Sequence, residues 1–157
     1  KKNVELSESE ILNIHSLVLM DRPEDKGRYR TVPVRIMESN VVLPQPYLIK
    51  PKIEELLREY TSDTKNIIEK IAKFHLDFER IHPFIDGNGR TGRLVLNFEL
   101  MKAGYLPINI KNADKQRYYE CFKIYDETQN YEEFVKLVCT YLIEEFERYI
   151  KIKEECV

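Results

Sequence analysis

The chain has 157 residues, of which 43% are hydrophobic and 33% are charged, and its formal net charge is -2. This balance is typical of one globular domain with a sizeable core, and it gives no reason to expect a nucleic-acid binder. The three cysteines have no CxxC spacing, which argues against a disulfide framework or zinc knuckle and favours a reducing, cytoplasmic location. No apolar run approaches the roughly 18 residues of a membrane span, and the chain does not start like a signal peptide. Because it begins at Lys1 without methionine, we expect a single domain, residues 1–157, excised from a longer chain.

The first predicted element is a helix that starts at Ser7. Ser7 and Glu10 form a capping box, and Leu6 with Ile11 can close a hydrophobic staple around the same helix start. Apolar residues then recur at helical spacing as far as Val18. The sequence therefore predicts one amphipathic helix at the amino end of the domain.

The next segment favours a short β-hairpin. Residues 31–36 alternate and are rich in β-branched side chains, Glu38–Asn40 is typical of a turn, and Val41–Leu43 follows. Pro33 lacks an N–H group, which places the first strand at an edge. One hairpin is marginal in water unless it packs on something else, so we expect it to lie against a helical core.

Helices dominate the rest of the chain. Apolar residues at helical spacing predict helices at about 53–60, 67–81, 90–101, 114–126 and 131–155. The helix at 90–101 is apolar almost all round, so we expect it to be buried at the centre. Gly104 is a suitable C-cap for it. The predicted fold is mainly α, a helical bundle with a surface hairpin.

The segment 82–93, with the sequence HPFIDGNGRTGR, carries the features of an anion site. Gly87 and Gly89 let a ligand approach the backbone closely, just before a helix N-terminus whose free N–H groups favour an anion. Arg90 and Arg93 lie three residues apart on that helix and share one face. Two guanidinium groups on one face suit a polyphosphate better than a single carboxylate.

Two further side chains of this segment complete a phosphoryl- or nucleotidyl-transfer site. Asp86 offers a hard oxygen ligand for Mg²⁺ shared with substrate phosphates. His82 titrates near neutral pH and is the natural proton acceptor. Each feature also has a structural alternative: a glycine–asparagine–glycine turn is usually only a turn, first-turn arginines are usually solvated, and His82 continues an apolar stripe. Twelve contiguous residues that meet every requirement favour the catalytic interpretation.

This segment resembles the signature of the Fic family, HxFx(D/E)GNGRxxR, at every defined position. His15 and Gly27–Arg30 resemble the family's upstream segment, and Arg117–Tyr119 resembles part of the helix after the motif. The resemblance covers residues 7–135, with the C-terminal helix at 131–155 beyond most of it. It implies a Fic-type helical bundle in which the hairpin is a "flap" beside the active-site loop.

The resemblance also implies a protein adenylyltransferase that moves AMP from Mg-ATP onto a Ser, Thr or Tyr hydroxyl group of a target protein. His82 would take the proton of that hydroxyl, and Asp86 would hold Mg²⁺. The remaining motif residues would bind the nucleotide: Phe84 as a packing anchor beneath the loop, Gly87, Asn88 and Gly89 around the phosphates with Asn88 on the α-phosphate, Arg90 on the β-phosphate and Arg93 on the γ-phosphate.

Binding of the target and of the base is predicted less directly. A target segment could add to the edge strand of the flap at Val34, Arg35 and Ile36, although the hairpin is also interpretable as a simple cover. Three aromatic residues could line an adenine pocket or could equally be core residues: Tyr118, Tyr119 and Phe122. Self-modification is open, and so is the oligomeric state, a dimer included.

Regulation and alternative reactions remain open at this level. Many Fic proteins carry an inhibitory (S/T)xxxE(G/N) helix, whose glutamate pairs with the second motif arginine. The two partial matches here, Thr140 to Glu144 and Thr128 to Glu132, both fail at the last position, so we expect a chain without self-inhibition. The alternatives are removal of AMP, another nucleotidyl or phosphoryl transfer, and a nucleotide-binding module without turnover.

Overall fold

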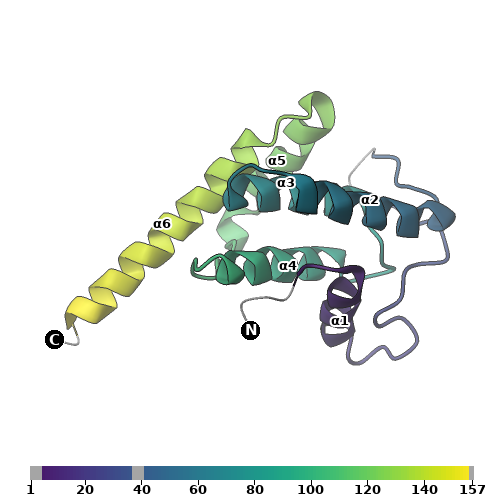
Figure 1. Ribbon diagram of the computed structural model, residues 1–157, viewed down its shortest axis with the longest axis horizontal. Helices are drawn as coiled ribbons and strands as arrows, with labels where there is room; N and C mark the ends of the chain where they lie inside the picture. Colours follow the sequence, from purple (N-terminus) through teal and green to yellow (C-terminus); the bar gives the residue numbers. More distant parts are fainter. Residues whose placement is uncertain (1–4, 37–40, 156–157) are drawn as a thin grey trace.

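The computed structural model describes residues 5–36 and 41–155, which form a helical bundle (Figure 1). Its helices are α1 (Glu8–Val18), α2 (Ile49–Ser62), α3 (Ile67–Ile81), α4 (Asn88–Lys102), α5 (Lys115–Thr128) and α6 (Glu132–Glu155), with short 3-10 helices at Pro46–Leu48 and Asn112–Asp114. α3 packs on α4, α2 and α6, and α1 packs on α4. α6 runs diagonally past α3 and projects beyond it to the carboxyl end of the chain. None of the described helices is both long and apolar enough to cross a bilayer.

Side-chain caps fix where three of the helices begin. Ser7 Oγ accepts a hydrogen bond from the Glu10 N–H, which confirms the predicted start of α1. The Asn66 side chain accepts from two N–H groups in the first turn of α3, and Asn130 accepts from the N–H of Glu132 at the start of α6. Each cap satisfies donors that have no partner inside the helix, which stabilises a helix start by about 1 kcal/mol.

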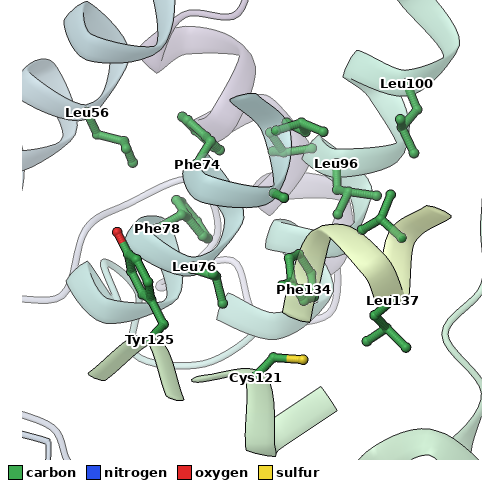
Figure 2. Close-up of a cluster of buried hydrophobic side chains, with 14 of the residues drawn as sticks. Leu56, Phe74, Leu76, Phe78, Leu96, Leu100, Cys121, Tyr125, Phe134 and Leu137 are labelled. Carbon is green, nitrogen blue, oxygen red and sulfur yellow. The ribbon is translucent and has the colours of Figure 1, made fainter. Parts of the chain in front are cut away.

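The core draws buried side chains from all six described α-helices, and Figure 2 shows a cluster of them. Phe78, Leu96 and Phe134 come from three different helices and are at most 1% exposed. Tyr125 and Cys121 close the core from α5. α3 contributes most because its apolar stripe faces the other helices, and this stripe ends where the predicted site begins.

The prediction that the helix at 90–101 is buried all round is only partly correct. Val95, Leu96 and Leu100 of α4 are buried against the bundle, whereas Leu94 and Met101 are 47% and 52% exposed. Apolar composition does not reveal how many neighbours a helix has, and α4 packs mainly on α3 and α1. The sequence therefore identified the core face and overestimated the burial of the opposite face.

The predicted β-hairpin is wrong for the described residues, because residues 31–36 and 41–43 form no strand. Its predicted turn at 38–40 lies outside the described residues. Pro33 cannot donate to a strand ladder, and the described part of the chain contains no sheet that could complete a lone hairpin. The guanidinium group of Arg30 instead donates to the carbonyl oxygens of Val32 (3.1 Å) and Pro44 (2.7 Å). A single side chain thus ties the two ends of this segment together.

Candidate active site

The candidate site surrounds the connection between α3 and α4. His82 caps α3 in the left-handed region, with φ 48° and ψ 60°, and Gly87 precedes α4 with φ 79°. The first intrahelical bond of α4 runs from the N–H of Thr91 to the carbonyl oxygen of Gly87. The N–H groups of residues 88–90 therefore have no acceptor inside the helix and are available to an anion.

The connection is held in shape from inside by Asn88. This side chain is 2% exposed, and its amide group accepts from the N–H of Phe84 and donates to the Phe84 carbonyl, both at 2.9 Å. Phe84 is fully buried and stacks on the ring of His15, with 3.6 Å between centroids. These contacts agree with the expected role of Phe84 as an anchor beneath the loop.

His15 fixes the loop from α1. Its Nδ1 accepts from the N–H of Gly27 at 3.0 Å, so the ring proton lies on Nε2 and is donated to the Asp86 carbonyl oxygen, also at 3.0 Å. Burial lowers the pKa of His15, and hydrogen bonding to Asp86 opposes this only in part. The imidazole is therefore a neutral bridge between α1 and the loop.

Arg30 fixes the backbone of His82 itself. Its Nε donates to the carbonyl oxygen of His82 at 2.8 Å, and its own N–H donates to the carbonyl of Pro83 at 2.9 Å. Arg30 is 4% exposed, and burial lowers the pKa of its guanidinium group. A left-handed residue other than glycine is strained and needs such support from its surroundings.

The hydrogen bonding of His82 leaves one ring nitrogen free to accept a proton, as a general base requires. Nδ1 lies 3.2 Å from the carbonyl oxygen of Glu79, so Nδ1 carries the proton and Nε2 keeps its lone pair. Burial lowers the pKa of His82, the bond to Glu79 opposes this, and the charge of Arg30 lowers the pKa further. His82 is therefore neutral near pH 7 and can accept a proton.

Asp86 and Arg90 lie at the solvent edge of the site. The Asp86 carboxylate, half exposed, pairs with Arg22 at 3.2 Å and with Arg90 at 3.4 Å. Arg90 also reaches the carbonyl oxygen of Val18 at 3.4 Å. No group of three or more acidic, histidine or cysteine side chains capable of holding a metal ion occurs among residues 5–36 and 41–155. A cation at this edge would therefore share Asp86 with a ligand's oxygen atoms.

A family model described as the Fic/DOC family matches residues 5–100, more than half of the chain. The chain belongs to the Fic/DOC family. The protein adenylyltransferase Fic of Drosophila grimshawi is 34% identical over 131 residues, which are 80% of this chain and 26% of that protein. The protein adenylyltransferase fic-1 of Caenorhabditis elegans is 32% identical over 152 residues, 96% of this chain and 30% of that protein. The chain thus spans less than a third of the length of these curated relatives.

Solved Fic structures share the architecture. The Caenorhabditis elegans Fic-1 structure matches with a TM-score of 0.85 at 27% identity, over 98% of this chain and 46% of that one. A Fic domain containing signaling protein from Bacteroides thetaiotaomicron matches with a TM-score of 0.82 at 26% identity, over 91% of this chain and 61% of that one. The helical fold around the connection of α3 and α4 is therefore a Fic fold.

Arg93 of the Fic motif points inward, unlike Arg90. Its guanidinium group hydrogen-bonds the hydroxyl group of Tyr118, which also lies 2.7 Å from Nε2 of His75. Burial lowers the pKa of His75 to about 4, so this ring is neutral and accepts the Tyr118 proton. The Glu79 carboxyl lies in the same buried region, and burial raises its pKa to about 7 against the opposing charge of Arg93.

The three predicted adenine-pocket residues differ in exposure. Tyr118 is 7% exposed and is bonded to His75 and Arg93, Phe122 is half-buried beside the core, and Tyr119 is 55% exposed. A cleft of about 320 Å³ is lined by Arg93 together with Val18, Asn97 and residues 108–110. The adenine pocket itself stays a prediction.

The partial inhibitory match on α6 shows no pairing with the motif arginine. The Glu144 carboxylate bonds Lys111 at 2.6 Å, whereas Arg93 bonds Tyr118. Glu132 begins α6 under the cap of Asn130. The expectation of a Fic chain without self-inhibition stays untested by these contacts.

Sequence reasoning missed four residues that shape the Fic site. It gave no role to His15 or Arg30 and did not mention Arg22 or Glu79. The bonds of Arg22 and Arg30 join segments more than 50 residues apart in sequence, so local patterns do not reveal them. Glu79 left a signal, since His75, Glu79 and His82 recur at helical spacing as a polar stripe beside the apolar one.

Proposed function

We propose that the chain is the catalytic domain of a protein adenylyltransferase, which transfers AMP from ATP to a hydroxyl group of a target protein. The observation that carries the proposal is the hydrogen bonding of His82, which leaves Nε2 free, together with the unpaired N–H groups at the start of α4 in the same connection. The Fic/DOC membership and the names of the curated relatives support the same reaction.

The proposed chemistry is an in-line displacement. The target hydroxyl oxygen attacks the α-phosphorus of ATP, the bond to pyrophosphate breaks, and the hydroxyl proton passes to Nε2 of His82. The N–H groups of Asn88 and Gly89 face the phosphates, and the Asn88 side chain keeps the loop open in addition to its predicted contact with the α-phosphate. Arg90 and Arg93 take the β- and γ-phosphates and stabilise the charge on the leaving group.

The residues at the solvent edge fit a Mg²⁺ ion. Mg²⁺ prefers one or two carboxylates together with substrate phosphates, and Asp86 is the half-exposed carboxylate of this loop. Bound Mg²⁺ would neutralise charge on the phosphates. Asp86 would hold it after exchanging its contacts with Arg22 and Arg90, whose guanidinium groups then become free for phosphate oxygens.

Target docking belongs to the same proposal. The irregular segment with Val34, Arg35 and Ile36 lies in sequence between Val32 and Pro44, whose carbonyl groups Arg30 binds, and Arg35 is exposed. A target backbone could pair with this segment on binding, as in β-augmentation. Adenine contact by Tyr118, Tyr119 and Phe122 and a cytoplasmic location are further predictions of the sequence, which leaves self-modification and a dimer open.

The test is transfer of radiolabel from ATP to protein. The chain is incubated with Mg²⁺, a desalted protein extract as acceptor, and ATP labelled on either the α- or the γ-phosphate. We expect label from the α-phosphate on the chain or on extract proteins, and its loss with His82→Ala. A matched control is Asp77→Asn, a residue of α3 that bonds Tyr125 and Lys73 outside the site.

The possible outcomes separate the alternative reactions. Label transferred only from the γ-phosphate would replace the proposal by phosphoryl transfer. Absence of both labels, together with saturable ATP binding in a calorimetric titration, would favour a nucleotide-binding module. Loss of label with the Asp77→Asn control as well would mean that His82 is not specifically required.

A further inference from the structure

Glu79 places a buried carboxyl group directly behind the proton acceptor. It lies on α3, one turn before His82, and is 9% exposed. Its Oε2 is 3.9 Å from Nδ1 of His82, and its Oε1 is buried without a hydrogen-bond partner in the described part of the chain. An unpaired buried carboxyl oxygen is costly, so a fold that retains one needs an explanation.

Small residues make room for this carboxyl group. A Cβ atom at Gly92 would lie 2.6 Å from Oε1 of Glu79, closer than side-chain atoms approach one another. A Cβ atom at Gly89 would lie 3.9 Å from the same oxygen. Both glycines belong to the motif segment, so this segment forms part of the wall around the Glu79 side chain.

The charged and titratable groups around the pair come from four parts of the chain. Arg93 of α4 and Tyr118 of α5 act on Glu79, and His75 lies on the same face of α3. Arg30 acts on His82 from the segment after α1. The charge of Arg30 opposes a positive imidazolium at His82, and Glu79 is the one acidic side chain that forms an ion-pair contact with a His82 ring nitrogen in the described residues.

We propose that Glu79 is a positioning residue for His82: its carboxylate stabilises the imidazolium that forms when His82 accepts the proton of the attacking hydroxyl. The proposal rests on the proposed function only for the origin of that proton. The proton comes from the hydroxyl group and forms the new N–H bond at Nε2. Nδ1 keeps its own proton, between the backbone carbonyl and the side-chain carboxylate of Glu79, so no other group changes its protonation.

The direct test measures the pKa of His82 without any transfer reaction. The imidazole nitrogen resonances of the three histidines are followed by NMR during a pH titration and are assigned with His82→Gln. The wild type is compared with Glu79→Gln, which keeps the shape and removes the charge, and with Asp77→Asn as the control on the same helix. Burial raises the pKa of Glu79 to about 7 and lowers that of His82, so Glu79 titrates at a higher pH than the ring 3.9 Å away, whose resonances sense the change of charge.

We expect the His82 nitrogen resonances of the wild type to show a titration step near pH 7, where Glu79 becomes ionised, in addition to the step of the imidazole itself. The step near pH 7 should be absent from Glu79→Gln and unchanged in Asp77→Asn. A wild type without this step, or the same step in Glu79→Gln, would overturn the proposal. Glu79→Asp keeps an ionisable carboxyl group and should keep such a step; its absence there would also overturn the proposal. Thermal melts establish that each variant is folded.

A kinetic readout separates positioning from mere packing. In the label-transfer assay, Glu79→Gln should lower kcat by about threefold to tenfold, since the base is weaker and its imidazolium less stable. The acid limb of the pH profile should move to lower pH, and the ATP concentration at half-saturation should stay within about twofold. A lower kcat with an unmoved acid limb would assign Glu79 to packing alone. Failure of the chain to transfer label would refute the proposed function and leave the NMR result intact.

Discussion

Replacing Glu79 by glutamine should also change how the stability of the fold depends on pH. Burial raises the pKa of Glu79 from 4.5 to about 7, and it lowers the pKa of His75, one turn earlier on α3, from 6.5 to about 4. The raised glutamate pKa contributes stability that is present below the unfolded value and lost as the pH rises through the folded one. The lowered histidine pKa contributes stability that is present above its unfolded value and lost on acidification.

The two contributions are of similar size and opposite sign. Each pKa difference corresponds to about 3 kcal/mol, because one pKa unit is worth about 1.4 kcal/mol. Between about pH 4.5 and 6.5, rising pH therefore costs the wild type unfolding free energy through Glu79 and returns a similar amount through His75. In Glu79→Gln only the histidine contribution remains, so this variant should gain stability steadily as the pH rises through that window.

The assay is urea unfolding of the wild type and of Glu79→Gln at a series of pH values. The difference in unfolding free energy should be near zero at about pH 4, where Glu79 is protonated in both states. It should grow to about 3 kcal/mol in favour of the variant at about pH 8. A difference that is constant over this range would refute the reasoning, and a wild type favoured at high pH would mean that Arg93 holds the carboxylate ionised.

Three further predictions concern the loop and its supports. Arg30→Met should lower the unfolding free energy by about 2–4 kcal/mol, because it removes the donor of three part-buried hydrogen bonds to carbonyl groups, and limited proteolysis between residues 31 and 44 should become faster. Asn88→Asp removes the donor to the Phe84 carbonyl and should cost about 1–3 kcal/mol in urea unfolding, with a loss of ATP binding by calorimetry. In Glu79→Gln, label transfer should fall on acidification only below about pH 6.5, because His82 must be neutral and burial lowers its pKa; a midpoint above that value in this variant would contradict the assignment.

Much of the fold was predictable because helices are encoded locally. The caps at Ser7 and Asn130 and the apolar stripe of α3 lie within single elements, and the structure has them close to where the sequence indicates. The segment after α1 was predicted wrongly as a hairpin. The alternating β-branched residues at 31–36 favour an extended backbone locally, but a strand also needs a partner strand. The bonds from Arg30 to Val32 and Pro44 come from a side chain outside both predicted strands.

For the site as well, residues close together in sequence were predicted, whereas contacts between distant segments were not. The motif gave the proton acceptor and both arginines, because all of them lie within twelve residues of one connection. It could not indicate that Arg90 faces solvent while Arg93 turns inward to Tyr118, since that difference depends on α5. It also gave no indication of Glu79, whose importance comes from burial and from its distance to His82, and neither is a property of sequence spacing.

The contacts of Arg30 have a mechanical consequence. Its guanidinium group donates to the carbonyl oxygens of Val32 and Pro44, at the two ends of one segment. Through Nε, the same group donates to the carbonyl oxygen of His82. A force that pulls this segment outward is therefore transmitted to the peptide that sets the direction of the imidazole. Arg30, a single buried side chain, therefore couples the segment proposed to bind a target to the residue proposed to take its proton.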